Sequence, residues 1–148
     1  QRNKITWNNI RWERGEIEAI ARNDGREVAR HKLESSDKAK KLKIIYDNNN
    51  WQADGLDLQH IRVYAVDKNG RRAYGCTANL KFSVEGDARI VAVSSGDHTS
   101  NEQNVCDSRR LHEGSAMVIL RAGRNPGKVV LNVESEDFPK VSVKLEEN

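Results

Sequence analysis

The chain has 148 residues, of which 36% are hydrophobic and 32% are charged, and its 25 Lys and Arg against 22 Asp and Glu give a net charge of +3. This excess is too small, and too mixed with acidic residues, to indicate a protein that binds nucleic acid. The densest basic run, at 38–43, is interpreted as the solvated start of a strand. No run of about 18 apolar residues indicates a membrane span.

Short alternating runs of apolar and polar residues, separated by turn residues, predict an all-β protein. In the N-terminal part, the pattern predicts a short strand at 10–12 and a β-hairpin formed by 16–21 and 27–33. Asn23-Asp24-Gly25 lies between the two hairpin strands, and Asp-Gly is suited to a type I′ turn. A polar hinge follows, so we expect a domain boundary after residue 36.

Residues 37–148 predict an immunoglobulin-like antiparallel β-sandwich of about seven strands. The expected strands lie at 42–46, 58–67, 80–84, 90–93, 116–120, 129–133 and 141–145. The stretch 94–110 has no periodicity and is expected to be a long loop. A short helix at 36–43 is the alternative for that segment, but it would lack an apolar face.

Alternation within the expected strands predicts the core. Its candidates are Ile61, Val63, Phe82, Val84, Val118, Leu120, Val130 and Val133. Along the clearest strand, Ile61, Val63 and Ala65 are expected on one face. The opposite face is expected to carry Gln59, Arg62 and Tyr64.

Residues that could carry chemistry are scattered along the chain. The four histidines are His31, His60, His98 and His112. No two of them are close enough in sequence to form the ligand pair that a zinc site needs. Asp97 and Glu102 could serve as calcium ligands or as a glycosidase's acid and nucleophile, but a glycosidase needs opposed carboxylates beside aromatic platforms, and 94–110 has no aromatic residue. We therefore expect no catalytic, cofactor-binding or metal site, and we expect these carboxylates to hydrogen-bond their own loop.

Six aromatic residues could stack on sugar rings, although each is more typical of a sandwich core or a domain contact: Trp7, Trp12, Trp51, Tyr46, Tyr64 and Tyr74. A carbohydrate-binding module would expose a coplanar pair of them. Cys76 and Cys106 could form one disulfide, but nothing in their spacing requires it. Both questions stay open at the level of sequence.

Several stretches, in chain order, carry a resemblance. WERGEIEA at 12–19 is similar to a Y-x-P-G-E-L-x-A segment, and GDHTSNE at 96–102 is similar to N-G-D-P-T-S-x-E. ADGLDL at 53–58 with VDKNG at 66–70, and RRLHEGSA at 109–116, also match. Together they resemble the C-terminal region of glycoside hydrolase family 2 β-galactosidases of the type common in gut Bacteroidetes. Ser95 and His98 depart from the loop pattern, where the family has Asn and Pro.

The resemblance implies a non-catalytic terminal domain at 37–148, preceded at 1–36 by the remnant of another β-sandwich domain. It implies a periplasmic or secreted parent enzyme that hydrolyses terminal β-galactosides with two glutamates on a (β/α)-barrel. No residue of this chain maps onto those glutamates, so the chain alone is expected to be inactive. Expected partners are the other domains of the parent glycosidase, with weak carbohydrate contact as an alternative and no nucleic acid or membrane. Alternative functions are a carbohydrate-binding module and an adhesin-type immunoglobulin-like spacer, which shares the Ala-Asp-Gly and Asp-x-x-Gly motifs.

The hairpin has an apolar face made by Ile17, Ala19, Val28 and Leu33. Because a two-stranded hairpin is marginal alone in water, this face is expected to pack on the following sandwich or on a second copy of the chain. A homodimer formed through the N-terminal hairpin is the favoured outcome.

Overall fold

The computed structural model describes residues 4–148, and within them it contains ten strands and no helix. The chain divides into two compact units, a first unit that ends at Ser35 and a second that begins at Ser36. The second unit holds eight of the strands and the entire hydrophobic core. The expectation of an all-β protein is confirmed.

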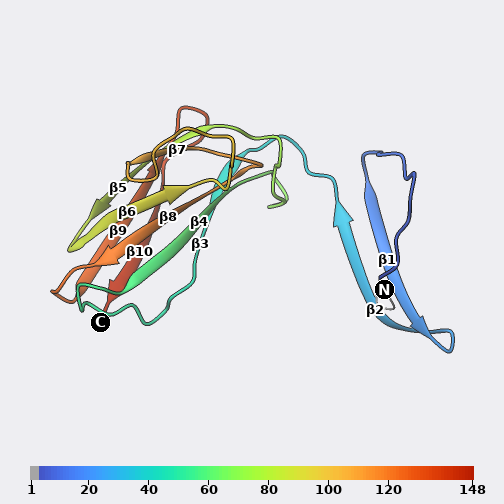
Figure 1. Cartoon of the computed structure of the whole chain (residues 1–148), viewed down its shortest axis with the longest axis horizontal. Helices are drawn as coiled ribbons and strands as arrows, with labels where there is room; N and C mark the ends of the chain where they lie inside the picture. Colours follow the sequence, from blue (N-terminus) through green and yellow to red (C-terminus); the bar gives the residue numbers. More distant parts are fainter. Residues whose placement is uncertain (1–3) are drawn as a thin grey trace. The chain divides into compact units, whose positions relative to one another are not determined.

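The first unit is a β-hairpin of β1 (Glu16–Asn23) and β2 (Arg26–Glu34), drawn in blue in Figure 1. Asp24 and Gly25 connect the strands with φ angles of 47° and 78°. A type I′ turn needs positive φ at both central positions, which explains why Asp-Gly stands here. The strand expected at 10–12 is wrong, because this segment is irregular and pairs with no described strand.

The two faces of the hairpin differ in polarity. Ile17 and Ala19 of β1 are paired with Leu33 and His31 of β2 on one face. On the other face, basic side chains of β2 form ion pairs with N···O distances of 2.6–3.2 Å: Arg30 with Glu18 and Glu27, and Lys32 with Glu16 and Glu34. Val28, expected on the apolar face, is the extra residue of a bulge.

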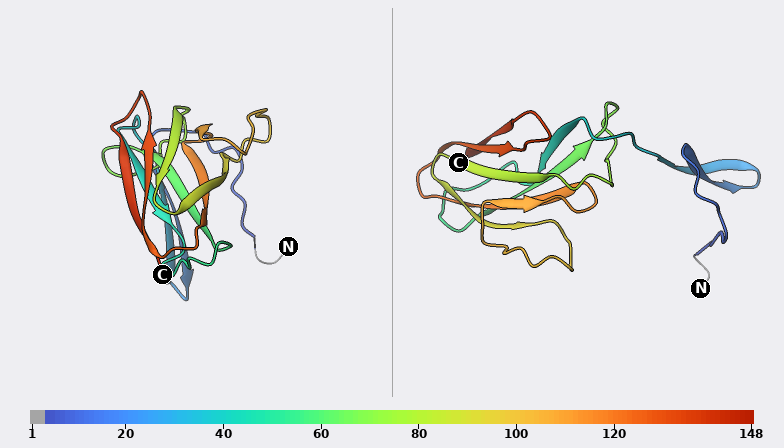
Figure 2. Two further views of the ribbon diagram at one scale, coloured as in Figure 1. Left: turned by 90° about the vertical axis from the view of Figure 1, so that its left-hand side faces the viewer. Right: turned by 90° about the horizontal axis from the view of Figure 1, so that it is seen from above.

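The second unit is a sandwich of two four-stranded antiparallel sheets packed face to face (Figures 1 and 2). One sheet has the order β3-β4-β8-β6, with bounds Lys41–Tyr46, Leu58–Val66, Ser115–Ala122 and Ala88–Ser94. The other has the order β10-β9-β5-β7, with bounds Val141–Glu147, Gly127–Glu134, Asn79–Glu85 and Ser108–Arg110.

This strand order confirms the immunoglobulin-like sandwich. With β3, β4, β5, β6, β8, β9 and β10 taken as strands A to G, the sheets are A-B-E-D and C-F-G, the arrangement of constant-type immunoglobulin domains. The eighth strand, β7, pairs with the free edge of β5. It lies in the stretch expected to be a loop, and with three polar residues it offers no hydrophobic period to detect.

The core lies between the two sheets, and most of its predicted members are buried there: Ile61, Val63, Phe82, Val118, Leu120 and Val133. Val84 is half-buried and packs against this core. The prediction for Val130 is wrong, because β9 turns Val129, Leu131 and Val133 inward and leaves Val130 half-buried on the outer face.

Gln59 corrects the expected faces of β4. It lies on the same face as Ile61 and is only 1% exposed. Its Oε1 accepts a hydrogen bond from the Asn48 N–H at 3.0 Å, and its Nε2 donates to the Asn48 carbonyl at 2.6 Å. The side chain therefore satisfies both of its polar ends by fixing the loop between β3 and β4, which makes burial of an amide tolerable.

Candidate functional site

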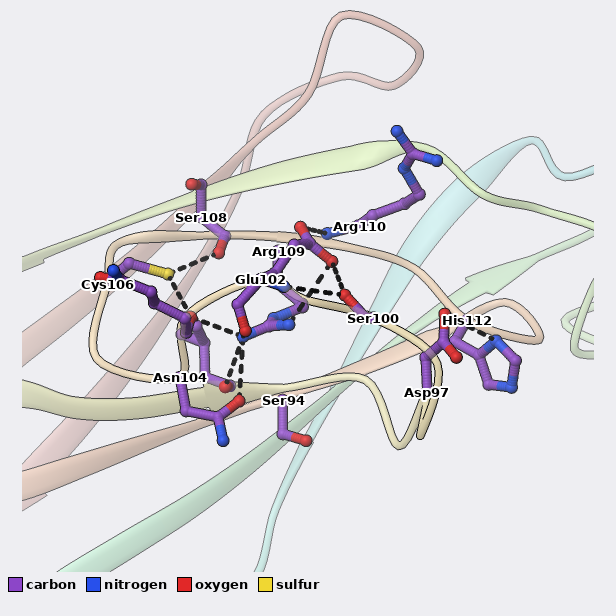
Figure 3. A network of polar contacts seen from close by, with 12 residues as sticks. Ser94, Asp97, Ser100, Glu102, Asn104, Cys106, Ser108, Arg109, Arg110 and His112 are labelled. Carbon is purple, nitrogen blue, oxygen red and sulfur yellow. Dashed lines mark hydrogen bonds and ion pairs between the residues drawn. The ribbon is translucent and has the colours of Figure 1, made fainter.

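The segment between β6 and β8 carries both candidate carboxylates, Asp97 and Glu102. It leaves β6 at Ser94, passes through β7 and enters β8 at Ser115. Two backbone hydrogen bonds attach it to the sheets, from Val93 N–H to Asn104 O and from Phe82 N–H to Asp107 O, both at 2.7 Å. Figure 3 shows the polar network that these anchors hold in place.

Arg109 of β7 is the centre of the network, and its side chain is only 3% exposed. Its Nη2 donates to Gln103 O at 2.7 Å, to Asn104 Oδ1 at 3.0 Å and to Val93 O at 3.2 Å (Figure 3). Its Nη1 lies 3.4 Å from Glu102 Oε2. The guanidinium thus neutralises one carboxylate and satisfies carbonyl groups that the irregular loop would otherwise leave unpaired.

Glu102 is bound by its own loop on both oxygens. Ser100 Oγ donates to Oε2 at 2.9 Å, and the Arg110 N–H donates to Oε1 at 3.2 Å. Burial, the largest effect, raises the pKa of Glu102, but these two hydrogen bonds and the charges of Arg109 and Arg110 outweigh it and lower the pKa overall. Glu102 is therefore an ionised acceptor at neutral pH.

Asp97 has the same character nearer the start of the loop. The hydroxyl and the N–H of Thr99 donate to its Oδ1 at 2.7 and 2.9 Å, and they lower its pKa in that order. His112 Nδ1 lies 3.8 Å from Oδ2 (Figure 3). His98, the residue directly after Asp97, also lowers the pKa of Asp97 through its charge when it is protonated.

The network is organised as a clamp on the loop. A glycosidase's general acid needs a raised pKa, whereas those of Asp97 and Glu102 are lowered. Both carboxylates accept hydrogen bonds from neighbouring donors of the same segment. The role of Arg109 was not predicted from the sequence, since a basic residue in a polar stretch has no periodic signal. Arg109 appeared there only as part of the RRLHEGSA stretch that carries the family resemblance.

The remaining histidines and the cysteines lie apart from this network. His31 is in the hairpin and His60 on the outer face of β4. Within residues 4–148, no group of three or more His, Cys, Asp and Glu side chains is placed to hold a metal ion. Cys76 and Cys106 are free, half-buried thiols, and Cys106 Sγ lies 3.0 Å from the carbonyl oxygens of Gln103 and Ser108.

The aromatic residues occupy several different settings. Trp51 is 1% exposed and donates its indole N–H to Asp57 O at 3.2 Å, so it is a core residue. Tyr64 and Tyr74 both contact Arg72, whose guanidinium carbon lies 5.5 and 4.6 Å from their ring centroids. These ring faces are therefore engaged by a cation. Among the described residues, four of these six aromatic residues are exposed: Trp7, Trp12, Tyr46 and Tyr74.

The part of the chain that the structure describes has no helix long and apolar enough to cross a membrane.

Comparison with known proteins identifies relatives of the chain. It is similar to β-galactosidase BoGH2A of Bacteroides ovatus, with 26% identity over 141 residues that cover 95% of this chain and 16% of that protein. A β-galactosidase of Thermoanaerobacter pseudethanolicus is 30% identical over 131 residues, with coverage of 88% and 16%. A β-glucuronidase of Formosa agariphila is 28% identical over 143 residues, with coverage of 94% and 14%. The chain thus spans about a sixth of the length of these relatives.

A solved structure agrees with these relatives. A glycosyl hydrolase family 2 member from Bacteroides cellulosilyticus superposes with a TM-score of 0.90 and 30% identity, over 94% of this chain and 18% of that one. The model of the family described as glycoside hydrolase family 2 C-terminal domain 5 matches residues 42–144, which includes nearly all of the sandwich. The chain therefore belongs to the glycoside hydrolase family 2 C-terminal domain 5 family.

Proposed function

We propose that this chain is a non-catalytic accessory domain of a family 2 glycosidase. The proposal rests on the family match over residues 42–144. The relatives of the chain are much longer proteins, and the chain covers only 14–16% of their length. The clamp around Arg109 supports it, because the carboxylates there stabilise a loop and have lowered pKa values. Hydrolysis of a glycoside needs two opposed carboxylates, of which one donates a proton.

For the parent enzyme we propose β-galactosidase activity, based on the resemblance of the quoted stretches and on two relatives named as β-galactosidases. β-Glucuronidase is the second candidate, because one relative of similar identity has that name. The sandwich gives no reason to prefer either substrate. We also propose a periplasmic or secreted location, which fractionation of the source cells with an antibody to the chain would test.

The hairpin is proposed to be the closing part of a preceding β-domain. Ile17 and Leu33 are 51% and 60% exposed and stand opposite each other on its apolar face. Such a face is stable only when covered, either by the other strands of its own domain or by a second copy of this chain. Sedimentation of the chain with and without residues 1–36 separates these cases. A homodimer through the hairpin predicts a dimer that becomes a monomer on deletion, and a monomeric intact chain contradicts it.

A domain exchange tests the accessory role. The region of the Thermoanaerobacter pseudethanolicus β-galactosidase that corresponds to this chain would be replaced by it, and also deleted in a second variant. We expect the chimera to hydrolyse an aryl β-galactoside, and we expect the deletion variant to lose thermal stability or assembly. An unchanged melting temperature and rate after deletion would contradict an accessory role for this domain.

A further inference from the structure

Three arginine side chains surround a hollow of about 420 Å³ at one end of the sandwich. Arg89 comes from β6, Arg121 from β8 and Arg124 from the turn between β8 and β9. The turn between β5 and β6 and the loop before β4 complete the wall, with Gly86 and Gly55. This hollow is separate from the Arg109 clamp and has no part in the proposed accessory role.

The arrangement of charge in the hollow is unfavourable without a ligand. Arg89 and Arg121 are directly opposite each other in the antiparallel pairing of β6 with β8. Like charges at directly opposed positions destabilise a sheet, which usually places opposite charges there. Among the described residues, none of the three arginines forms an ion pair with a carboxylate. Arg121 donates through Nε to Gly55 O at 2.8 Å. Within residues 4–148, no acceptor lies within hydrogen-bond distance of the guanidinium groups of Arg89 and Arg124.

Asp87 is itself part of the wall of the hollow and Asp54 lies in the adjoining loop, and both carboxylates accept hydrogen bonds from other donors. Asp87 Oδ2 accepts from the backbone N–H groups of Arg124 and Asn125, both at 3.0 Å, and from the Asn125 side chain at 2.7 Å. Asp54 Oδ1 accepts from two backbone N–H groups of its own loop at 2.7 Å. The charge of Arg121 contributes only the last of the effects that lower the pKa of Asp54. Neither carboxylate therefore bonds to a guanidinium of this group.

Glycine residues keep the hollow open and its wall rigid. A Cβ on Gly86 would come within 2.5 Å of Lys128 O, so this turn packs directly on β9 and Gly86 adds no side chain to the hollow. At Gly55 a Cβ would lie 3.3 Å from Cγ and Nε of Arg124, which shows that the Arg124 side chain lies along this loop. The arginines are thus presented by strands and a close-packed turn.

We propose that this hollow binds a small oxyanion, a carboxylate or sulfate group such as an acidic sugar carries. Guanidinium groups present planar pairs of N–H donors that match both groups, and they lose less hydration than an ammonium on binding. A volume of about 420 Å³ accommodates a ligand of monosaccharide size. An oxyanion between Arg89 and Arg121 would remove the repulsion between them and supply the acceptors that Arg89 and Arg124 lack.

The experiment is a titration of the intact chain, followed by amide chemical shifts at constant ionic strength. The probes are sodium sulfate, galactose 6-sulfate, galacturonate and neutral galactose, with sodium chloride as reference. We expect saturable shifts at residues 55, 86–89 and 121–125 with an oxyanion and none there with galactose. Tighter binding of the two acidic sugars than of inorganic sulfate identifies a saccharide ligand, whereas equal binding identifies the free oxyanion as the ligand.

Arg89→Gln is the decisive variant, because the Arg89 side chain has no bonded partner among the described residues whose loss would disturb the fold. It should weaken oxyanion binding about tenfold, the loss expected for one charge-assisted hydrogen bond. Arg62→Gln is the matched control, an exposed arginine on β4 of the same sheet that is paired with Asp47 at 2.6 Å. Equal binding by the two variants, or no saturable shift with any of the three oxyanion probes, would overturn the proposal.

Discussion

Replacing Arg109 with Met tests whether this buried guanidinium holds the loop between β6 and β8. Met keeps an apolar stem of similar length and removes every donor. The two shortest hydrogen bonds lost, to Gln103 O at 2.7 Å and Asn104 Oδ1 at 3.0 Å, are made by a charged group. Such bonds contribute about 1.5–3 kcal/mol each, so we expect the free energy of unfolding to fall by about 3–6 kcal/mol.

Urea unfolding followed by fluorescence measures this change, with buried Trp51 as the reporter of the sandwich. Hydrogen exchange of amides at 95–107 should accelerate more than exchange in β4 and β9, because the loss is local. Arg110→Met is the control, since Arg110 is the exposed neighbour on the same strand. If the two variants differ by less than about 0.5 kcal/mol, the size of an ordinary surface substitution, Arg109 is not a clamp.

Three further predictions concern the sandwich. Phe82→Ala should lower the free energy of unfolding by about 3–5 kcal/mol because the ring is buried, and Val130→Ala by less than about 1 kcal/mol; equal losses in urea unfolding would contradict the assigned faces. Gln59→Leu should cost about 2–3 kcal/mol by the same measurement and speed amide exchange at Asn48, and unchanged exchange there would be the contrary result. Burial raises the pKa of Glu147, although the hydrogen bond from the Gly123 N–H opposes this shift. The fold therefore disfavours the ionised form of Glu147, and the free energy of unfolding should increase as the pH falls through the raised pKa. Glu147→Gln should therefore be more stable than the native chain near pH 7, with the difference shrinking toward about pH 4, and a difference that grows on acidification would reverse the assigned sign.

The strands with a hydrophobic period could be predicted from the sequence. Alternation located β4, β5, β8, β9 and β10, and Asp24-Gly25 located the hairpin turn, because each signal reports the local backbone directly. The alternation predicted the wrong face where a polar residue occupies a position that points into the core. Gln59 is buried through two hydrogen bonds to a loop that is distant in sequence, which no local pattern reveals.

The candidate loop shows a similar limit. The short side chains from Asp97 to Glu102 indicated a segment that hydrogen-bonds itself, and the structure shows those bonds. The role of Arg109 could not be foreseen, because it depends on carbonyl groups of the preceding loop and of β6 that meet only in the fold. The Arg89 and Arg121 pair likewise arises from the register of β6 on β8.

An assay of the purified chain for hydrolysis of an aryl β-galactoside distinguishes a structural clamp around Arg109 from an active site. We expect a rate indistinguishable from buffer at high protein concentration, because Asp97 and Glu102 are ionised acceptors of the loop and neither can donate a proton at neutral pH. Turnover above the buffer rate that disappears in Asp97→Asn or Glu102→Gln would contradict it, and would make the clamp an active site.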